Sequence, residues 1–377
     1  MHKTMFKIEE LINITNGKYI GDEGIKGVSL SISTDTRTIT ENDAYLALVG
    51  AVFDGHEFVQ KAFENGAKLA IVNEKFPCEK GNFLVVKDTL EAYLKIANAN
   101  RTRRSAKIIA VTGSSGKTTT KEFLYSVFNS KFKTQKSIKN HNNEIGLCQT
   151  LLFIEPDTKY CIVEMGMRAL GEIDTLAKYA RPDIAIITNA GTAHIGILGS
   201  RENIAKAKCE ITNYLGQSGV LLAHDEELIK NELANKDSFE KIFYDYKDVE
   251  IIEKNESSSK IKYDDFIFEI PSSADYDILN ALVSIKTAKL ENYSDEDIQK
   301  GLLNFQNVEF RNEIIKSNSG AIIISDCYNA NPDSTEASLR HICEVYRDKK
   351  IVVVFGDMLE LGEFEEFYHK KNLGGVS

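Results

Sequence analysis

Residues 108–120 read IIAVTGSSGKTTT, an apolar run that gives way to a glycine-serine turn, a lysine and three threonines. The two glycines allow the backbone to curl so that its N–H groups converge on anionic oxygens. A helix that follows the turn directs its positive end to the same charge. A strand, a glycine-containing turn and a helix in this order are typical of a phosphate-binding loop, so the stretch predicts a nucleotide-binding α/β domain.

Within this loop, Lys117 is placed to neutralise the outer phosphates of a nucleotide and Thr118 to hold magnesium. The usual pattern has a further glycine where Val111 stands, so the loop is a shortened variant. The alternative is an ordinary strand-to-helix turn with a surface lysine. The residues expected to bind ATP here are Gly113, Ser114, Ser115, Gly116, Lys117, Thr118 and Thr119.

Composition limits the class of protein. A chain of 377 residues with 42% hydrophobic and 27% charged residues is typical of a globular protein of two or three domains. The formal charge of −10 and the lack of a basic stripe argue against nucleic-acid binding. The N-terminus lacks the apolar core of a signal peptide, and no apolar run approaches the roughly 18 residues that span a bilayer. Its six scattered cysteines suggest neither a disulfide framework nor a zinc site. We therefore expect a cytoplasmic protein, and a monomer.

Apolar runs alternate with helical stretches along the chain, which predicts three α/β parts. Residues 1–104 form a small unit, 105–312 a central domain with a parallel doubly wound sheet, and 313–377 an incomplete third unit. The polar, basic run at 100–107 is interpreted as a linker, although a solvated helix end has the same composition. Alternating residues between 237 and 271 predict antiparallel strands. In the third unit, 321–325 and 351–355 predict two strands.

Polar residues follow several strands of the central domain, where parallel sheets bind ligands. Glu164 ends one apolar run and could coordinate magnesium opposite Thr118, or it could be a solvated acid at a strand end. Asn189 and His194 follow the next run. Fourteen residues after His194, Lys208 lies on a predicted helix with Lys206, where lysines usually face solvent.

The sequence resembles the Mur ligase family of ATP-dependent amide-forming enzymes. The matching segments extend over nearly the whole chain: TDTR (34–37), FDGH (53–56), TGSSGKTTTK (112–121), NHNNEIG (140–146), VEMGMR (163–168), TNAGTAHIG (188–196), AKAKCEI (205–211), DCYNANPDS (326–334) and GDMLELGE (356–363). The resemblance implies three domains: an N-terminal UDP-sugar-binding domain, a P-loop ATPase domain and a Rossmann-like C-terminal domain. NHNNEIG and DCYNANPDS favour addition of D-alanyl-D-alanine to UDP-N-acetylmuramoyl-tripeptide, in peptidoglycan precursor synthesis.

The resemblance also implies roles for individual residues. ATP converts a substrate carboxylate to an acyl phosphate, which an amine attacks, and Lys117 would stabilise the transferred phosphoryl group. Thr118 and Glu164 would hold one Mg²⁺, His194 would help to hold a second, and Lys208 would be carbamylated. The remaining expected contacts are Asn280 to adenine, Arg311 to ATP phosphate, Asp326 to ribose, and Asp35, Thr36, Arg37, Asp54, Gly55, His56, Asn142 and Asn143 to the substrates.

Two departures from the family pattern stand out. Tyr276 and Asp277 occupy positions where the family has histidine and asparagine. After His369 the pattern is lost, and the resemblance implies that most of the C-terminal domain is absent and that the apolar run at 351–356 is exposed. Besides a ligase, the sequence allows a catalytically impaired remnant that binds nucleotide or UDP-sugar, a sibling ligase with another amino-acid donor, or another P-loop ATPase.

Overall fold

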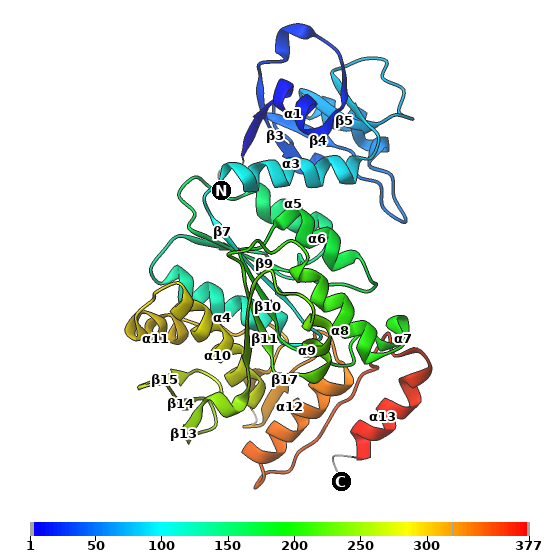
Figure 1. The fold of residues 1–377 in the computed structure, drawn as a ribbon. Helices are drawn as coiled ribbons and strands as arrows, with labels where there is room; N and C mark the ends of the chain where they lie inside the picture. The colour runs from blue at the N-terminus through cyan, green and yellow to red at the C-terminus, as the bar shows by residue number, and fades with distance from the viewer. Residues whose placement is uncertain (1–3, 319, 375–377) are drawn as a thin grey trace. The chain divides into compact units, whose positions relative to one another are not determined.

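The computed structural model describes residues 4–318 and 320–374, which form two compact units (Figure 1). One unit comprises Met1–Ala106 and His141–Thr158, and the other comprises Lys107–Asn140 and Lys159–Ser377. Segment 141–158 lies in the sequence range predicted for the central domain but folds with the N-terminal residues. Among the described residues, no helix is long and apolar enough to cross a membrane.

The N-terminal unit is built on a six-stranded mixed sheet. Its inner strands are parallel, and the two outermost pairings are antiparallel. Leu69, Ala70, Ile71 and Val72 are all buried because both faces of this strand are covered. In spatial order the strands are β1 (Met5–Lys7), β3 (Ser29–Ser33), β4 (Asp43–Leu46), β5 (Leu69–Asn73), β6 (Phe83–Val86) and β2 (Lys18–Ile20).

Four helices accompany this sheet: α1 (Ile8–Thr15), α2 (Val59–Glu64), α3 (Thr89–Arg103) and α5 (Glu144–Leu152). Helix α3 begins at Thr89 because the Asp88 side chain accepts the N–H of Glu91. The basic run interpreted as a linker begins as the last turn of this helix. There, Asn100 Nδ2 donates to the carbonyl of Leu151 at 2.7 Å, which ties α3 to α5. The short connection to the second unit therefore starts only at Arg104.

The second unit contains the predicted parallel sheet. All six strands run in the same direction, and the strand before the glycine turn lies inside the sheet. In spatial order they are β12 (Glu240–Tyr244), β11 (Val220–His224), β10 (Ile184–Ile187), β7 (Lys107–Thr112), β9 (Tyr160–Glu164) and β8 (Thr134–Lys136). The carboxyl ends of these strands meet at one edge of the sheet.

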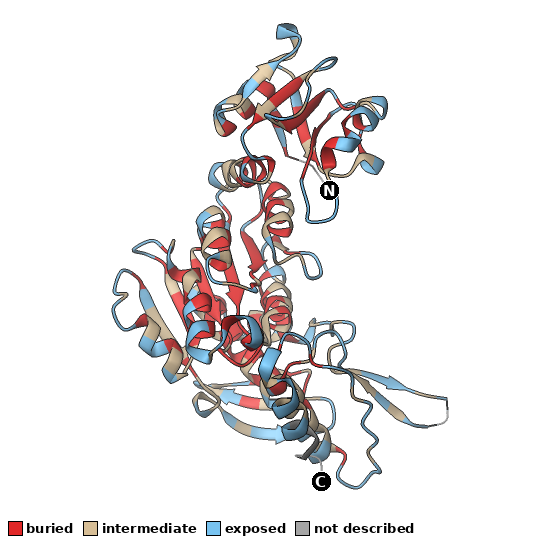
Figure 2. Cartoon of the chain, turned by 90° about the vertical axis from the view of Figure 1, so that its right-hand side faces the viewer, coloured by how far each residue is buried: buried red, intermediate tan, exposed pale blue. Residues whose placement is uncertain are grey.

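Helices cover both faces of this sheet, as the doubly wound pattern requires (Figure 1). Ile109 and Val111 of the sheet share one core with Phe123 of α4 and Ile285 of α10. Figure 2 shows buried residues concentrated along the strands and the inward sides of the helices. The helices are α4 (Lys117–Asn129), α6 (Glu172–Ala180), α7 (Ile195–Leu198), α8 (Arg201–Cys209), α9 (Glu227–Leu233), α10 (Asp275–Leu290) and α11 (Asp295–Leu303).

The antiparallel prediction for 237–271 is confirmed for three strands and wrong for the first. Strands β13 (Glu250–Lys254), β14 (Ser259–Tyr263) and β15 (Phe266–Ile270) form an antiparallel sheet. The run before them is β12, which pairs parallel to β11 and extends the main sheet. An alternating pattern indicates a strand with two unlike faces but does not fix the direction of its neighbour.

The C-terminal part contains an antiparallel pair, β16 (Glu313–Lys316) and β17 (Ile322–Ser325), followed by α12 (Pro332–Val345) and α13 (Glu365–Gly374). The strand predicted at 321–325 is confirmed, whereas that at 351–355 is wrong. Val352 and Val354 are 74% and 94% exposed, as expected of an uncovered apolar run. β-Branched residues form a strand only where a neighbouring strand pairs with them and one face of the strand packs against other residues. In the described structure, residues 351–355 lack both.

Candidate active site

The phosphate-binding loop connects β7 to α4 through two glycines with positive φ. Gly113 has φ +155°, and a Cβ there would lie 1.8 Å from Thr188 Oγ1. Gly116 has φ +77° and precedes the first residue of α4, and a Cβ on it would lie 2.6 Å from Asn280 Oδ1. Neither position has room for a side chain, so the loop curls tightly around the N-terminus of α4.

Asn189, from the end of β10, holds this loop in place. Its Oδ1 accepts the backbone N–H groups of Ser114 and Ser115 at 3.1 and 3.0 Å, and its Nδ2 donates to Ser115 Oγ at 3.0 Å. Thr188 Oγ1 donates to the carbonyl of Ser115. The sequence indicated a polar residue at this strand end, but its role as an anchor was not predicted, because that role depends on the neighbouring strand.

Lys117 lies over the loop it follows. Its Nζ donates to the carbonyls of Gly113 at 2.8 Å and Ser114 at 3.3 Å. Burial lowers the pKa of Lys117, the charge of Glu164 raises it, and that of Arg311 lowers it. The lysine therefore places a cation next to the positive end of α4, an arrangement suited to phosphate.

Thr118 and Glu164 meet beside the loop, as predicted. Thr118 Oγ1 donates to Glu164 Oε2 at 3.0 Å. Glu164 ends β9 and is 3% exposed, so the alternative of a solvated acid at a strand end is wrong. Hydroxyl and carboxylate oxygens are the ligands that Mg²⁺ prefers.

Lys208 and His194 bring further charge to the same region. Lys208 is 1% exposed on α8, whereas Lys206 faces solvent. Burial lowers the pKa of Lys208 well below its usual value, and the charge of Lys117 lowers it further. Burial also lowers the pKa of His194; Glu360 raises it, and Lys208 and Lys117 lower it. These charges are thus close enough to influence one another.

Residues 114–119, at the phosphate-binding loop and the start of α4, border a cleft of about 340 Å³. The predicted nucleotide contacts Asn280, Arg311 and Asp326 all line it. Asn280 Oδ1 accepts from Thr120 Oγ1 at 3.1 Å, and the guanidinium of Arg311 lies 4.4 Å from the ring centre of Tyr328. Two buried polar atoms on the cleft residues, Ser114 Oγ and Arg311 Nε, have no hydrogen-bond partner among the described residues. Such unpaired donors favour an anionic ligand.

Asp277 and Tyr276, which depart from the family pattern, also line this cleft. Asp277 Oδ2 accepts from Ser272 Oγ at 2.7 Å, and Oδ1 lies 3.5 Å from Asn280 Nδ2. Burial raises the pKa of Asp277 to about 6, although both hydrogen bonds lower it. The folded protein thus binds a proton at Asp277 more tightly than the unfolded chain does.

We expect Asp277→Asn to stabilise the free protein above pH 6. The carboxyl titrates near its ordinary value when unfolded and near 6 when folded, so stability is lost as pH rises through this window. Removing the charge should recover about 2–3 kcal/mol at pH 7.5 and almost nothing at pH 4. Urea unfolding at both pH values measures this. Asp275→Asn, on the exposed side of the same helix, is the control, and an equal gain at both pH values would contradict the explanation.

The C-terminal part contacts the loop that contains His194. Asp333 Oδ2 accepts from the N–H and Oγ1 of Thr192 at 2.6 and 2.7 Å. The Glu360 carboxylate pairs with His194 Nδ1, and its carbonyl accepts the N–H of Gly196 at 3.0 Å. A Cβ on Gly196 would lie 2.4 Å from the backbone nitrogen of Gly362, so the two segments approach closely. These contacts were not predicted, because they join residues more than 100 positions apart.

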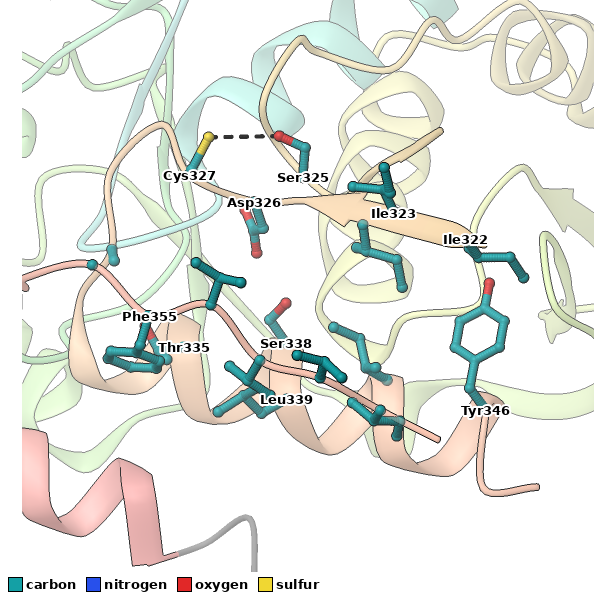
Figure 3. A pocket seen from close by; sticks show the side chains of 18 of the residues that line it. Ile322, Ile323, Ser325, Asp326, Cys327, Thr335, Ser338, Leu339, Tyr346 and Phe355 are labelled. Atoms are coloured by element: carbon teal, nitrogen blue, oxygen red, sulfur yellow. Dashed lines mark hydrogen bonds between the residues drawn. The ribbon is translucent and has the colours of Figure 1, made fainter. Parts of the chain in front are cut away.

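A second, larger hollow of about 800 Å³ lies within the C-terminal part. It is enclosed by β17, α12 and the extended segment after α12, and Ile322, Leu339 and Tyr346 line it (Figure 3). Asp326 lies at its edge and also lines the nucleotide cleft. Aliphatic side chains such as Ile322 and Leu339 and polar side chains such as Ser325 and Lys350 both line the hollow.

The expected UDP-sugar loops lie in the N-terminal unit. Asp35 accepts the backbone N–H of Arg37 at 3.0 Å and pairs with its guanidinium at 2.7 Å, which lowers the pKa of Asp35 to about 2. Asp54 caps the turn that holds Gly55 and pairs with His56 Nδ1 at 2.5 Å.

Charges from both loops also act on Tyr45 in this unit. Burial raises the pKa of Tyr45 to about 12, and the charges of Asp54 and Asp35 add to the effect, so the two loops converge. Thr36 lies in the first loop, and Asn143 caps α5 next to Asn142.

Comparison with known proteins covers most of the chain. Three family models match it: "Mur ligase family, catalytic domain" at residues 30–108, "Mur ligase middle domain" at 111–288 and "Mur ligase, glutamate ligase domain" at 310–376. The UDP-N-acetylmuramoyl-tripeptide–D-alanyl-D-alanine ligase of Bacillus subtilis is 36% identical over 370 residues, which are 97% of this chain and 81% of that protein. The enzyme of the same name from Escherichia coli is 29% identical over 96% of this chain and 81% of its own length.

Solved structures are also similar. MurF from Acinetobacter baumannii superposes with a TM-score of 0.91 at 31% identity, over 99% of this chain and 83% of that chain. The MurF ligase of Thermotoga maritima, solved in complex with ADP, gives 0.82 at 26% identity, over 92% and 82%.

Proposed function

This chain belongs to the Mur ligase family, and we propose that it joins D-alanyl-D-alanine to UDP-N-acetylmuramoyl-tripeptide at the expense of ATP, in peptidoglycan precursor synthesis. The observation that carries the proposal is a phosphate-binding loop that lines the cleft, together with the pairing of Thr118 in that loop region with the buried Glu164. Both substrates are taken from the names of the relatives in Bacillus subtilis and Escherichia coli. ATP and a UDP-linked peptide are cytoplasmic metabolites, and we place the reaction in that compartment.

The reaction has two steps. A carboxylate oxygen of the tripeptide attacks the γ-phosphorus of ATP, the bond to the bridging oxygen breaks and ADP leaves, which forms an acyl phosphate. The amine of D-alanyl-D-alanine then attacks the acyl carbon, the carbon–oxygen bond to phosphate breaks, and the nitrogen loses a proton. Negative charge moves across the phosphoryl oxygens in the first step and onto the leaving phosphate in the second. A site for this chemistry must therefore supply fixed cations and N–H donors.

The residues of the cleft can supply these groups. The N–H groups at the N-terminus of α4 would hold the phosphates, and the Lys117 ammonium lies at the loop, where it can neutralise the transferred phosphoryl group. Arg311, whose Nε has no partner among the described residues, is suited to a phosphate oxygen. Asn280 and Asp326, which both line the cleft, are suited to the base and the ribose.

The residues present fit a magnesium ion, because a hydroxyl and a buried carboxylate lie together beside the phosphate loop. Thr118 and Glu164 would hold one ion, and His194 with Lys208 a second. Bound there, Mg²⁺ would neutralise phosphate charge and polarise the phosphorus. Among the described residues no three His, Cys, Asp or Glu side chains cluster as a ready metal cage, which suits an ion that takes phosphate and water oxygens for the rest of its shell.

Lys208 could help to hold the second magnesium ion only if it carries a carbamate. A buried ammonium near Lys117 opposes a metal ion, whereas the neutral amine that burial favours can add CO₂ and release a proton to become an anion. We propose this modification at Lys208 rather than at the exposed Lys206.

In the N-terminal unit, we propose that the loops with Asp35, Thr36, Arg37, Asp54, Gly55 and His56 bind the UDP-sugar. Both loops are held by their own aspartates, so their backbone shape is formed before a ligand arrives. Asn142 and Asn143 are proposed to contact the substrates from the same unit.

A donor panel tests the proposal. The purified chain is incubated with ATP, Mg²⁺ and UDP-N-acetylmuramoyl-tripeptide, together with D-alanyl-D-alanine, L-alanine, D-glutamate, L-lysine or diaminopimelate, and the products are weighed by mass spectrometry. We expect a product only with the dipeptide. A product with a single amino acid instead would identify a sibling ligase, and ATP hydrolysis that ignores every donor would indicate another P-loop ATPase.

A further inference from the structure

Lys121 is a buried lysine that has no part in the proposed mechanism. It lies on α4 one turn after Lys117 and is 0% exposed. Its Nζ lies 3.3 Å from Glu164 Oε2 and donates to the carbonyl of Lys139 at 2.7 Å. A second carboxylate, that of Glu122, is 3.6 Å away. The side chain thus extends along the inner face of the helix to the carboxylate beside the phosphate loop.

The partners of Lys121 make it more than a packing residue. A buried ammonium is tolerated only where charges and acceptors compensate it, and a buried carboxylate has the same need. Lys121 and Glu164 meet this need for each other. The oxygen that pairs with Lys121 also accepts from Thr118 Oγ1, so an ion pair and a hydrogen bond act on the same carboxylate oxygen.

Lys121 also fixes the turn after β8. Lys139 has φ +49°, a left-handed conformation that residues other than glycine adopt rarely, and its carbonyl is the one that accepts from Lys121. One ammonium therefore links three segments: the helix of the phosphate loop, the end of β9 and this turn. Removing the ammonium takes one partner from the carboxylate and one donor from the carbonyl of this turn.

We propose that Lys121 is a positioning residue that orients Glu164 toward the metal ion of the bound nucleotide. The inference rests on the proposed function, because it takes Glu164 as a metal ligand. Groups that orient the ligands of a metal typically contribute 10- to 100-fold to its affinity. Lys121 itself contacts neither the nucleotide nor the reacting atoms in this account.

Calorimetric titration with ADP, in the presence of Mg²⁺ and in EDTA, tests the proposal on three proteins: the parent chain, Lys121→Met and Lys136→Met. Lys136 is the matched control, because it pairs with Glu122 in the same group of charges but not with Glu164. We expect Lys121→Met to bind Mg²⁺–ADP at least about tenfold more weakly, with metal-free ADP bound within about threefold of the parent. Lys136→Met should match the parent in both titrations.

The outcomes separate this inference from the proposed function. If Mg²⁺ does not strengthen ADP binding by the parent, the magnesium site itself is rejected. If the parent and Lys121→Met gain equally from Mg²⁺, or if metal-free ADP binding falls as far as Mg²⁺–ADP binding, Lys121 has no positioning role. If Lys121→Met does not fold, the double variant Lys121→Met/Glu164→Gln is tested for folding. A folded double variant would show that Lys121 compensates the charge of Glu164. A double variant that also fails to fold would show that Lys121 contributes only to packing.

Discussion

Replacing Lys117 with methionine is expected to lower the rate of ATP-dependent ligation by roughly 1,000-fold or more. The ammonium lies at the phosphate loop, held by the carbonyls of Gly113 and Ser114, where the transferred phosphoryl group would pass. Methionine keeps most of the length of the side chain but has no charge. Phosphate release measured under saturating substrates gives the rate.

A measurement of protein stability shows whether the expected loss of rate comes from unfolding. Burial lowers the pKa of Lys117, so the folded protein holds this charge at a cost, and removing it should not lower the thermal midpoint at neutral pH. Lys131→Met, on an exposed lysine that pairs with Asp297, should keep the parent rate. A Lys117→Met protein that is folded and retains more than about a tenth of the parent rate would show that the loop lysine does not stabilise the transferred group.

The second large effect is expected at Lys208. Lys208→Ala should lower the rate at least about 100-fold, because it removes the proposed carbamate anion from the metal site. Adding a short carboxylate such as formate or acetate should restore part of the rate, since a diffusible anion can occupy the space left by the shortened side chain. The measurement is phosphate release as a function of carboxylate concentration.

Lys206→Ala is the control for this experiment, because Lys206 lies on the same helix but faces solvent. It should keep the parent rate and show no response to carboxylate. Chloride at equal ionic strength should not rescue Lys208→Ala. A loss of activity without any rescue by carboxylates would argue that Lys208 acts as a buried cation or by packing, and not as a carbamate.

Much of the fold could be predicted from the sequence because its signals are local. The apolar runs before Gly113, Glu164 and Asn189 each form a strand of one parallel sheet, and the carboxyl ends of such strands converge. That convergence is why Thr118 and Glu164, 46 positions apart, could be expected to meet. The choice of Lys208 as a site residue came from the family resemblance, and its burial could not be deduced from a helical pattern.

The features that could not be predicted depend on contacts between residues that are far apart in the sequence. Neighbouring strands decide whether an apolar run pairs, which is why β12 joined the main sheet and 351–355 formed no strand. The anchoring role of Asn189, the contacts of Lys121 and the pairing of Glu360 with His194 require knowledge of which segments pack together. No residue spacing in the sequence indicates such contacts.

The most direct test of the central claim is phosphate release by the 377-residue chain with ATP, Mg²⁺, UDP-N-acetylmuramoyl-tripeptide and D-alanyl-D-alanine, omitting each in turn. We expect sustained release only when all four are present, with one phosphate for each peptide bond formed. If ADP binds tightly but no phosphate is released with the complete mixture, the chain binds nucleotide without catalysing ligation, and the account of this cleft as a working active site is wrong.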